Sequence, residues 1–337
     1  MSKKILFVFM VVFLISFNFF QNTTEATIYK KEENKTESEI FLLRVEHYLN
    51  LLPKENTGIF NVKYVFPPIY NYQVPILLEL YNDSTADIKN YKIENDTLKP
   101  NKFVNFTIDN INKDEKKLIH FTIWVLVENN EFNDLPENKN FPDKEKLPES
   151  TKKWLSESDV VQTDNLFIKL RSLKIKLFYN DLISYADRVS SFIKNHRFLL
   201  FFIELRTGLF FSQDAVTTLF INGENVGRSH LACALLRNQN IPSRVLLVNN
   251  DQGFWTQMHY MVEYYVPNYG WVLLDPTKGV TPYETSRQII NRYCYPSDEN
   301  DTKQDYILPF MKGEERWLWT DDNAIQPYYK DCDEGSK

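Results

Sequence analysis

The chain has 337 residues, of which 43% are hydrophobic and 25% are charged, a composition typical of folded proteins. At roughly 100–200 residues per domain, this length allows two domains. The net charge is −6 at pH 7, and no dense stretch of Lys and Arg interleaved with aromatic residues occurs, so the sequence gives no sign of nucleic-acid binding. No phosphate-binding or dinucleotide-binding fingerprint is present. No Cys or His pairs have zinc-site spacing, and we expect no cofactor.

The first residues have the pattern of a targeting segment. Lys3 and Lys4 precede an apolar run over residues 5–20, so we predict residues 1–26 as a cleaved signal peptide. The alternative is an uncleaved anchor, because the run approaches the roughly 17–25 residues that span a bilayer. Either alternative predicts a secreted or cell-surface protein outside the cytoplasm, with contact to the membrane only through that segment.

Export permits disulfides, and the chain has three cysteines. Cys294 and Cys332 could pair and leave Cys233 free, or all three thiols could be unpaired. The sequence leaves both alternatives open.

The N-terminal half changes its hydrophobic period near residue 55. Residues 27–54 read as a linker and a short helix, since apolar residues between 40 and 52 recur at helical spacing and Pro53 would end the helix. Residues 55–130 alternate between apolar and polar in short runs separated by polar clusters. This pattern predicts a small β-sandwich-like module.

The C-terminal half begins after a charged, Pro-containing stretch at residues 131–160, which we predict as a second linker. Helical periodicity returns over residues 165–202. We assign residues 161–300 to a second domain and residues 301–337 to a C-terminal tail.

A series of motifs between residues 222 and 277 carries the clearest functional signal. In order, the chain reads Asn-Gly-Glu-Asn at 222–225, Ala-Leu-Leu-Arg at 234–237, Ile-Pro-Ser-Arg at 241–244, His at 259 with Val-Glu at 262–263, and Gly-Trp-Val-Leu-Leu-Asp-Pro-Thr at 270–277. This order resembles the core of the transglutaminase-like superfamily, relatives of papain-type cysteine enzymes. The resemblance implies an α+β, papain-like domain preceded here by the β-sandwich-like module.

The resemblance also implies a catalytic thiol at a helix N-terminus, a His on a neighbouring strand and an Asp that orients the imidazole. In this sequence the three positions fall on Asn225, His259 and Asp275. A turn at residues 268–270 would fold His259 and Asp275 toward each other, but a one-residue slip of register would separate them. Calcium sites, which some relatives use, stay open because acidic residues are scattered along the chain.

Asn225 determines whether the site can be catalytic. A carboxamide has no ionisable nucleophile near neutral pH, although Asn is a good helix N-cap residue. Ser229 and Cys233 are weaker candidates for a replacement nucleophile, since each would need a base within hydrogen-bond reach. His230 reads as a packing residue.

Aromatic residues near His259 offer a candidate substrate groove. Trp255 and Tyr260 would line it for an extended peptide, or else they pack in the core. Three functions are therefore open. The first is a catalytically inactive protein that binds extracytoplasmic peptide or protein segments. The second is an active protease, amidase or acyl transferase with an atypical nucleophile, and the third is a structural cell-envelope scaffold.

Overall fold

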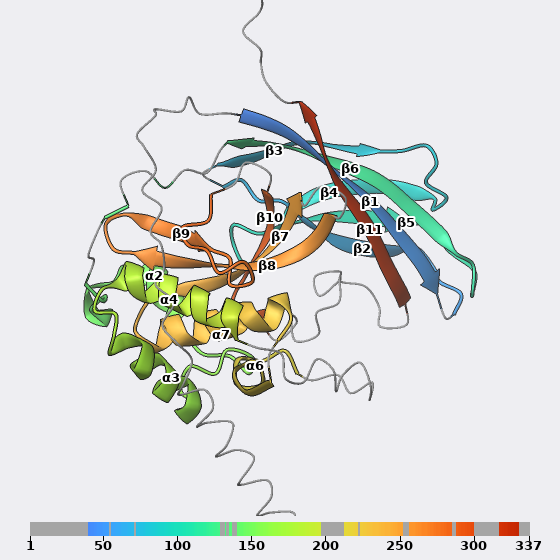
Figure 1. The fold of residues 1–337 in the computed structure, drawn as a ribbon. Helices are drawn as coiled ribbons and strands as arrows, with labels where there is room; N and C mark the ends of the chain where they lie inside the picture. Colours follow the sequence, from blue (N-terminus) through green and yellow to red (C-terminus); the bar gives the residue numbers. More distant parts are fainter. Residues whose placement is uncertain are drawn as a thin grey trace, which may run out of the picture. The chain divides into compact units, whose positions relative to one another are not determined.

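The structure is a computed structural model of the whole chain. It describes residues 40–53, 55–70, 72–128, 132, 135–136, 140–196, 212–221, 223–251, 256–284, 288–299 and 317–329. The described residues form a β-rich N-terminal region and an α+β region, which Figure 1 shows in the colours of the sequence. The predicted signal segment, residues 1–26, lies outside the described residues.

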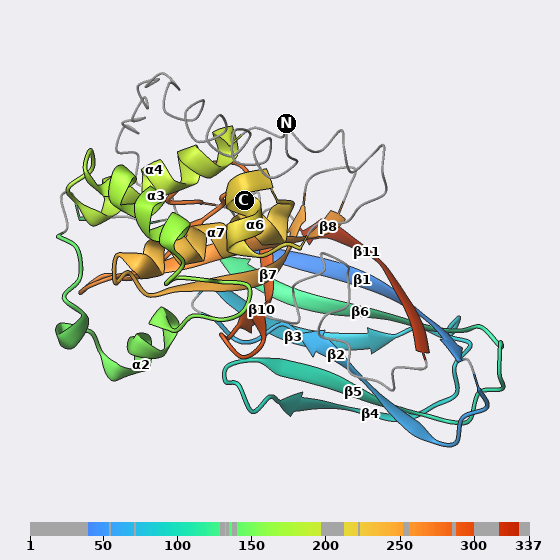
Figure 2. The same ribbon diagram turned by 90° about the horizontal axis from the view of Figure 1, so that it is seen from below.

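Two sheets build the β-rich region (Figure 2). The first has the order β11-β1-β6-β3 and the second the order β2-β5-β4. Their strands are β1 (Ile40–Pro53), β2 (Phe60–Phe66), β3 (Gln73–Leu80), β4 (Ile88–Asn95), β5 (Lys102–Ile108), β6 (Lys117–Glu128) and β11 (Trp317–Tyr329). The rings of Phe106 on β5 and Phe121 on β6 lie 5.2 Å apart between the sheets. The two sheets therefore bury a shared apolar face, as in a sandwich.

The helix predicted for residues 40–52 is wrong, because these residues belong to strand β1. Apolar residues in this stretch fit helical spacing, but every second side chain from Phe41 to Leu51 is also buried, which is the two-residue period of a strand. β1 pairs along its length with β6 and with β11. These partners lie far away in the sequence, so local spacing could not decide between the two structures.

Part of the C-terminal tail predicted for residues 301–337 is instead strand β11. Residues 317–329 are an antiparallel partner of β1, with Leu42 opposite Tyr329 at one end and Pro53 opposite Trp317 at the other. The end of the chain thus completes the first sheet of the β-rich region. The final residues after Tyr329, and Cys332 with them, lie outside the described residues.

The stretch predicted as a second linker is partly packed. Its 3-10 helices η1 (Lys144–Lys146) and η2 (Lys153–Leu155) flank the short helix α2 (Glu149–Lys152). Trp154 and Val160 are buried in the hydrophobic core. The last third of this stretch therefore belongs to the folded α+β region, because its large apolar side chains have core partners.

The α+β region has one antiparallel sheet with the order β10-β7-β8-β9. Its strands are β7 (Ser243–Asp251), β8 (Thr256–Val266), β9 (Gly270–Leu274) and β10 (Gln288–Cys294). The helices are α3 (Leu166–Lys176), α4 (Leu182–Asn195), α6 (Ala215–Ile221) and α7 (Asn225–Asn238). α7 packs against β7 and β8 on one side and against α3, α4 and α6 on the other. All its residues from Val226 to Arg237 are buried for this reason.

Hydrogen bonds join the two regions of the described chain. The side chain of Gln73 on β3 donates to the carbonyl of Ile290 and accepts from its N–H, each at 2.8 Å. Asn101 bridges in the same way to the backbone of Tyr293. β10 therefore rests against the β-rich region.

Among the described residues, no helix combines the length and apolar character needed to cross a bilayer.

Candidate functional site

The β8–β9 hairpin sets the geometry of the predicted His–Asp pair. Val266 pairs with Gly270 and Val262 with Leu274 across a three-residue turn. Asn268 and Gly270 adopt positive φ values of 63° and 125° there, a conformation that suits these two residue types. Extending the register by one residue places Asp275 opposite Met261, on the same face as His259.

His259 and Asp275 form a buried hydrogen-bonded pair. Nε2 of His259 lies 3.2 Å from Oδ2 of Asp275, and the two residues are 3% and 0% exposed. The other carboxylate oxygen, Oδ1, accepts from the backbone N–H groups of Thr277 at 2.9 Å and Lys278 at 3.0 Å. Burial raises the pKa of Asp275, but the hydrogen bonds and the imidazole outweigh it and hold the pKa below its ordinary value. The carboxylate is therefore ionised and fixed in orientation beside the ring.

Asn225 is linked to this pair through Thr277. The Thr277 hydroxyl donates to Oδ1 of Asn225 at 3.0 Å, while the N–H of Thr277 holds Asp275. Asn225 is the first residue inside α7, and Glu224 stands at the N-cap without a side-chain capping bond. The predicted N-cap role of Asn225 is therefore wrong, because its amide oxygen is engaged by the loop after β9.

The start of α7 is held by close backbone packing. Oε1 of Gln213 accepts from the N–H of Glu224 at 2.8 Å. A Cβ at Gly227 would lie 2.5 Å from Oγ1 of Thr218 and 2.7 Å from Oε1 of Gln213. Gly227 is therefore required for the approach of α6 and the preceding turn to α7, and this approach positions Asn225.

Arg228 is a charged neighbour of the site that the sequence did not single out. Its Nε donates to the carbonyl of Gly223 at 3.1 Å, and the negative charge of Asp275 stabilises the charged form of its guanidinium. Burial lowers the pKa of Arg228 while Asp275 opposes that shift. The signal in the sequence was its place three residues after Asn225, which puts both on one helix face.

A family profile and one solved structure agree with this architecture. Residues 183–276 match the profile of the Transglutaminase-like superfamily. These residues form a transglutaminase-like domain. The chain is similar in fold to a candidate cysteine protease from Cytophaga hutchinsonii, with a TM-score of 0.62 and 15% identity over 88% of this chain and 93% of that one. A candidate protease from Parabacteroides distasonis gives a TM-score of 0.27 at 16% identity, over 67% of this chain and 42% of that one. No curated protein sequence matches significantly.

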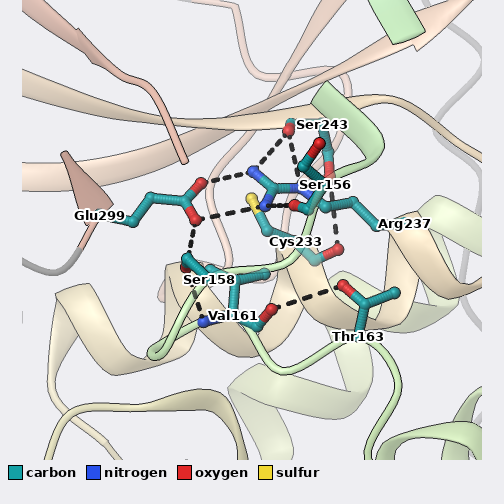
Figure 3. A network of polar contacts seen from close by, with 8 residues as sticks. All are labelled: Ser156, Ser158, Val161, Thr163, Cys233, Arg237, Ser243 and Glu299. Carbon is teal, nitrogen blue, oxygen red and sulfur yellow. Dashed lines mark hydrogen bonds and ion pairs between the residues drawn. The ribbon is translucent and has the colours of Figure 1, made fainter. Parts of the chain in front are cut away.

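Two motif arginines of the transglutaminase-like domain are structural. Arg237 forms a fully buried ion pair with Glu299 at 2.5 Å and also donates to the carbonyls of Ser156 and Ser243 (Figure 3). Arg244 pairs with Glu263 at 2.6 Å, and Tyr70 of the β-rich region donates to the same carboxylate. Arg237, Arg244 and Glu263 of the motifs therefore stabilise the packing of the sheet and helix, and they do not line the site.

The two alternative nucleophiles lie inside the core of the transglutaminase-like domain. Ser229 is fully buried, and its hydroxyl donates to the carbonyl of Asn225 at 3.0 Å. Cys233 is also fully buried, and burial raises the pKa of its thiol to about 12. Cys294 is a buried thiol on β10, and burial raises its pKa as well. Its pairing with Cys332 stays a prediction.

Of the two predicted groove aromatics, the structure describes Tyr260. Tyr260 is 2% exposed and belongs to the hydrophobic core, so its assignment as a groove residue is wrong in this structure. Trp255 lies outside the described residues. His230 is a packing residue as expected, with Nδ1 at 2.6 Å from the carbonyl of Gln213. No group of three or more possible metal ligands occurs in the described part of the chain.

Proposed function

We propose that this chain is an exported, catalytically inactive transglutaminase-like protein that binds an extended peptide segment beside His259 and Asp275. In this proposal Asn225 occupies the position of the thiol nucleophile. The observation that carries it is the hydrogen bond between Asn225 and Thr277, which directs a carboxamide to the loop that holds Asp275. Export is supported by the targeting pattern of residues 1–26.

Inactivity follows from the chemistry of the groups present. Acyl transfer through a covalent intermediate needs a nucleophile with a base in reach, and an amide nitrogen has no lone pair to offer. Cys233 and Cys294 are both fully buried, so their thiols are shielded from substrate as well as from ionisation. The His259–Asp275 pair would then orient a bound segment without completing a reaction.

Peptide binding is supported by the side-chain amide of Asn225 and by the N-terminus of α7. The amide oxygen of Asn225 accepts a hydrogen bond from the hydroxyl of Thr277, and the Nδ2 of Asn225 donates to none of the described residues. This amide group can donate to a peptide carbonyl. The positive end of the α7 dipole lies at the same end of the helix and favours a carbonyl oxygen there.

An extended-peptide library read by both binding and mass spectrometry tests the proposal. We expect saturable binding by the wild-type chain, no new peptide products, and a loss of binding in Asn225→Leu. The matched control is Asn90→Leu on β4, where the asparagine is exposed and remote from the pair. Product formation that disappears in His259→Gln would show an active enzyme and overturn the proposal.

The burial of Tyr260 favours a second candidate, a structural cell-envelope scaffold. Its side chain is 2% exposed and packs in the hydrophobic core, so it does not line a groove. The scaffold hypothesis predicts neither product formation nor saturable binding to any peptide in the same library. Saturable binding that Asn225→Leu weakens would exclude it.

A further inference from the structure

His120 on β6 lies in an aromatic sandwich on the outer face of the first sheet. Its neighbour Phe121 points between the two sheets, so His120 points outward. The imidazole stacks between the rings of Tyr48 on β1 and Tyr81 just after β3, with both centroids 4.2 Å away. β1 and β3 pair with β6 on its two sides (Figure 2). Both faces of the imidazole are therefore covered, and only its edge can form hydrogen bonds.

Both ring nitrogens of His120 lie against carboxylates. Nδ1 is 2.6 Å from Oδ1 of Asp83, and Nε2 is 2.8 Å from Oε1 of Glu46. An ionised carboxylate accepts hydrogen bonds and donates none. Each nitrogen therefore carries a hydrogen in this arrangement, and the ring is a positively charged imidazolium. The faces of the two tyrosine rings also favour a positive charge between them.

The groups around the ring keep Glu46 ionised. Burial raises the pKa of Glu46, but hydrogen bonds from His120 and Tyr48 and the charge of Arg44 hold it below its ordinary value. Burial and the nearby Glu46 raise the pKa of Tyr48 to about 12, so its hydroxyl stays protonated. Among the described side chains, the charged and titratable groups on this face of the strands beside β6 are Arg44, Glu46 and Tyr48 on β1, and Glu79, Tyr81 and Asp83 on β3 and the turn after it.

The backbone of His120 holds the same turn. Its N–H donates to Oγ of Ser84 at 3.0 Å, and its carbonyl accepts from the N–H of Tyr81 at 3.0 Å. Residues 81–86 lead from β3 in the first sheet toward β4 in the second. Asp83 is therefore the residue through which the charge on the ring acts on the connection between the two sheets.

We propose that His120 is a pH-sensitive latch, whose imidazolium holds the turn of residues 81–86 and whose neutral form releases Asp83. A neutral imidazole has one N–H, so it can donate to only one of the two carboxylates. The side chain of Glu46 is 15% exposed and that of Asp83 is 61% exposed. Leaving the more buried Glu46 without a donor costs more. The neutral ring therefore keeps its hydrogen on Nε2, and the carboxylate of Asp83 turns toward water.

The direction of the effect follows from which form of the ring binds both carboxylates. The contact with Asp83 is present at low pH, where the ring is charged, and it is lost as the pH rises and the ring gives up a proton. His196 has the opposite sign, because its burial favours the neutral ring. The latch lies in the β-rich region and does not depend on peptide binding at the His259–Asp275 pair.

A pH titration of the full chain, read by NMR and by hydrogen exchange, tests the latch. Long-range nitrogen spectra show which ring nitrogens carry a hydrogen, and the signals lost in His120→Gln are those of His120. We expect hydrogens on both nitrogens at the low end of the titration and loss of the one on Nδ1 as the pH rises. Deuterium uptake by residues 81–86, corrected for the intrinsic effect of pH, should rise in step by about tenfold, as for one lost charge-assisted hydrogen bond.

Asp83→Asn removes the charge that the latch holds. An amide can accept from the charged ring and donate to the neutral one, so uptake by residues 81–86 should no longer depend on pH in this variant. The matched control is Asp164→Asn, an exposed aspartate that pairs with Lys169 in the α+β region, and it should behave as the wild type.

Three results would overturn the proposal. The first is a ring of His120 whose protonation does not change over the pH range in which the protein stays folded. The second is loss of the hydrogen from Nε2 instead of Nδ1. The third is uptake by residues 81–86 that does not follow the titration of the ring, or that keeps its pH dependence in Asp83→Asn.

Discussion

The side-chain oxygen of Asn225 and the hydroxyl of Thr277 are joined by a 3.0 Å hydrogen bond that links the first turn of α7 to the loop after β9. The N–H of the same threonine donates to Asp275, which in turn bonds to His259. A single residue therefore couples the helix start to the His–Asp pair. The carboxamide is fixed by a tertiary contact, not by helix capping.

Thr277→Val should weaken this coupling. The variant removes the donor to Asn225 and leaves the amide oxygen unsatisfied, so we expect a loss of about 1 kcal/mol in the free energy of unfolding. Thr277→Ser keeps the hydroxyl and should lose less than about half of that amount. Urea denaturation of the three proteins measures the difference. Equal stabilities for the valine and serine variants would mean that the hydroxyl contributes nothing.

The buried pair of Arg237 and Glu299 should be costly to break from either side. Both side chains are 0% exposed, so Arg237→Met or Glu299→Leu alone leaves an unpaired buried charge and should cost about 3–5 kcal/mol. The double variant should lose less than the sum of the single losses. The exposed pair of Lys63 and Glu94 is the control, and Glu94→Gln should cost less than about 1 kcal/mol. Additive losses at Arg237 and Glu299 would contradict the pairing.

His196 should make stability fall in mild acid. Burial, together with the nearby Arg171, lowers the pKa of His196 from 6.5 to about 4. Below pH 6.5 the unfolded chain therefore takes up a proton that the folded chain does not. Stability should fall as the pH drops from 6.5 toward 4, by at most about 1.4 kcal/mol per pH unit from this group, and then level off.

The variant His196→Gln isolates that contribution. It should flatten the curve of unfolding free energy against pH between 6.5 and 4, while the fall caused by other groups stays. Urea denaturation at a series of pH values in this window provides the measurement. An unchanged slope in the variant would show that folding does not lower the pKa of His196.

Local sequence signals predicted the hairpin of the site well. Asn268 and Gly270 favour the positive φ values that the turn adopts. The register was left open, because a one-residue slip would separate His259 and Asp275. The observed pairing of β8 with β9 places the two residues on one face.

Contacts between distant residues limited the other predictions. Residues 40–52 fit both a helix and a strand, and their pairing with β6 and β11 decides for the strand. Thr277 is 52 residues from Asn225, so local capping preferences gave the wrong role for the asparagine. Glu299 lies outside the motifs, and nothing near Arg237 in the sequence pointed to it as partner.

The reactivity of a thiol placed at residue 225 tests the central claim most directly. We would measure the rate of alkylation of Asn225→Cys against pH in a Cys332→Ser background, with and without His259→Ala. If Asn225 stands where related enzymes carry their nucleophile, the new thiol should have a pKa well below the ordinary value of about 8.5. The further change His259→Ala should return that pKa toward the ordinary value. A thiol that is unreactive, or that titrates at the ordinary value whether or not His259 is present, would contradict the account.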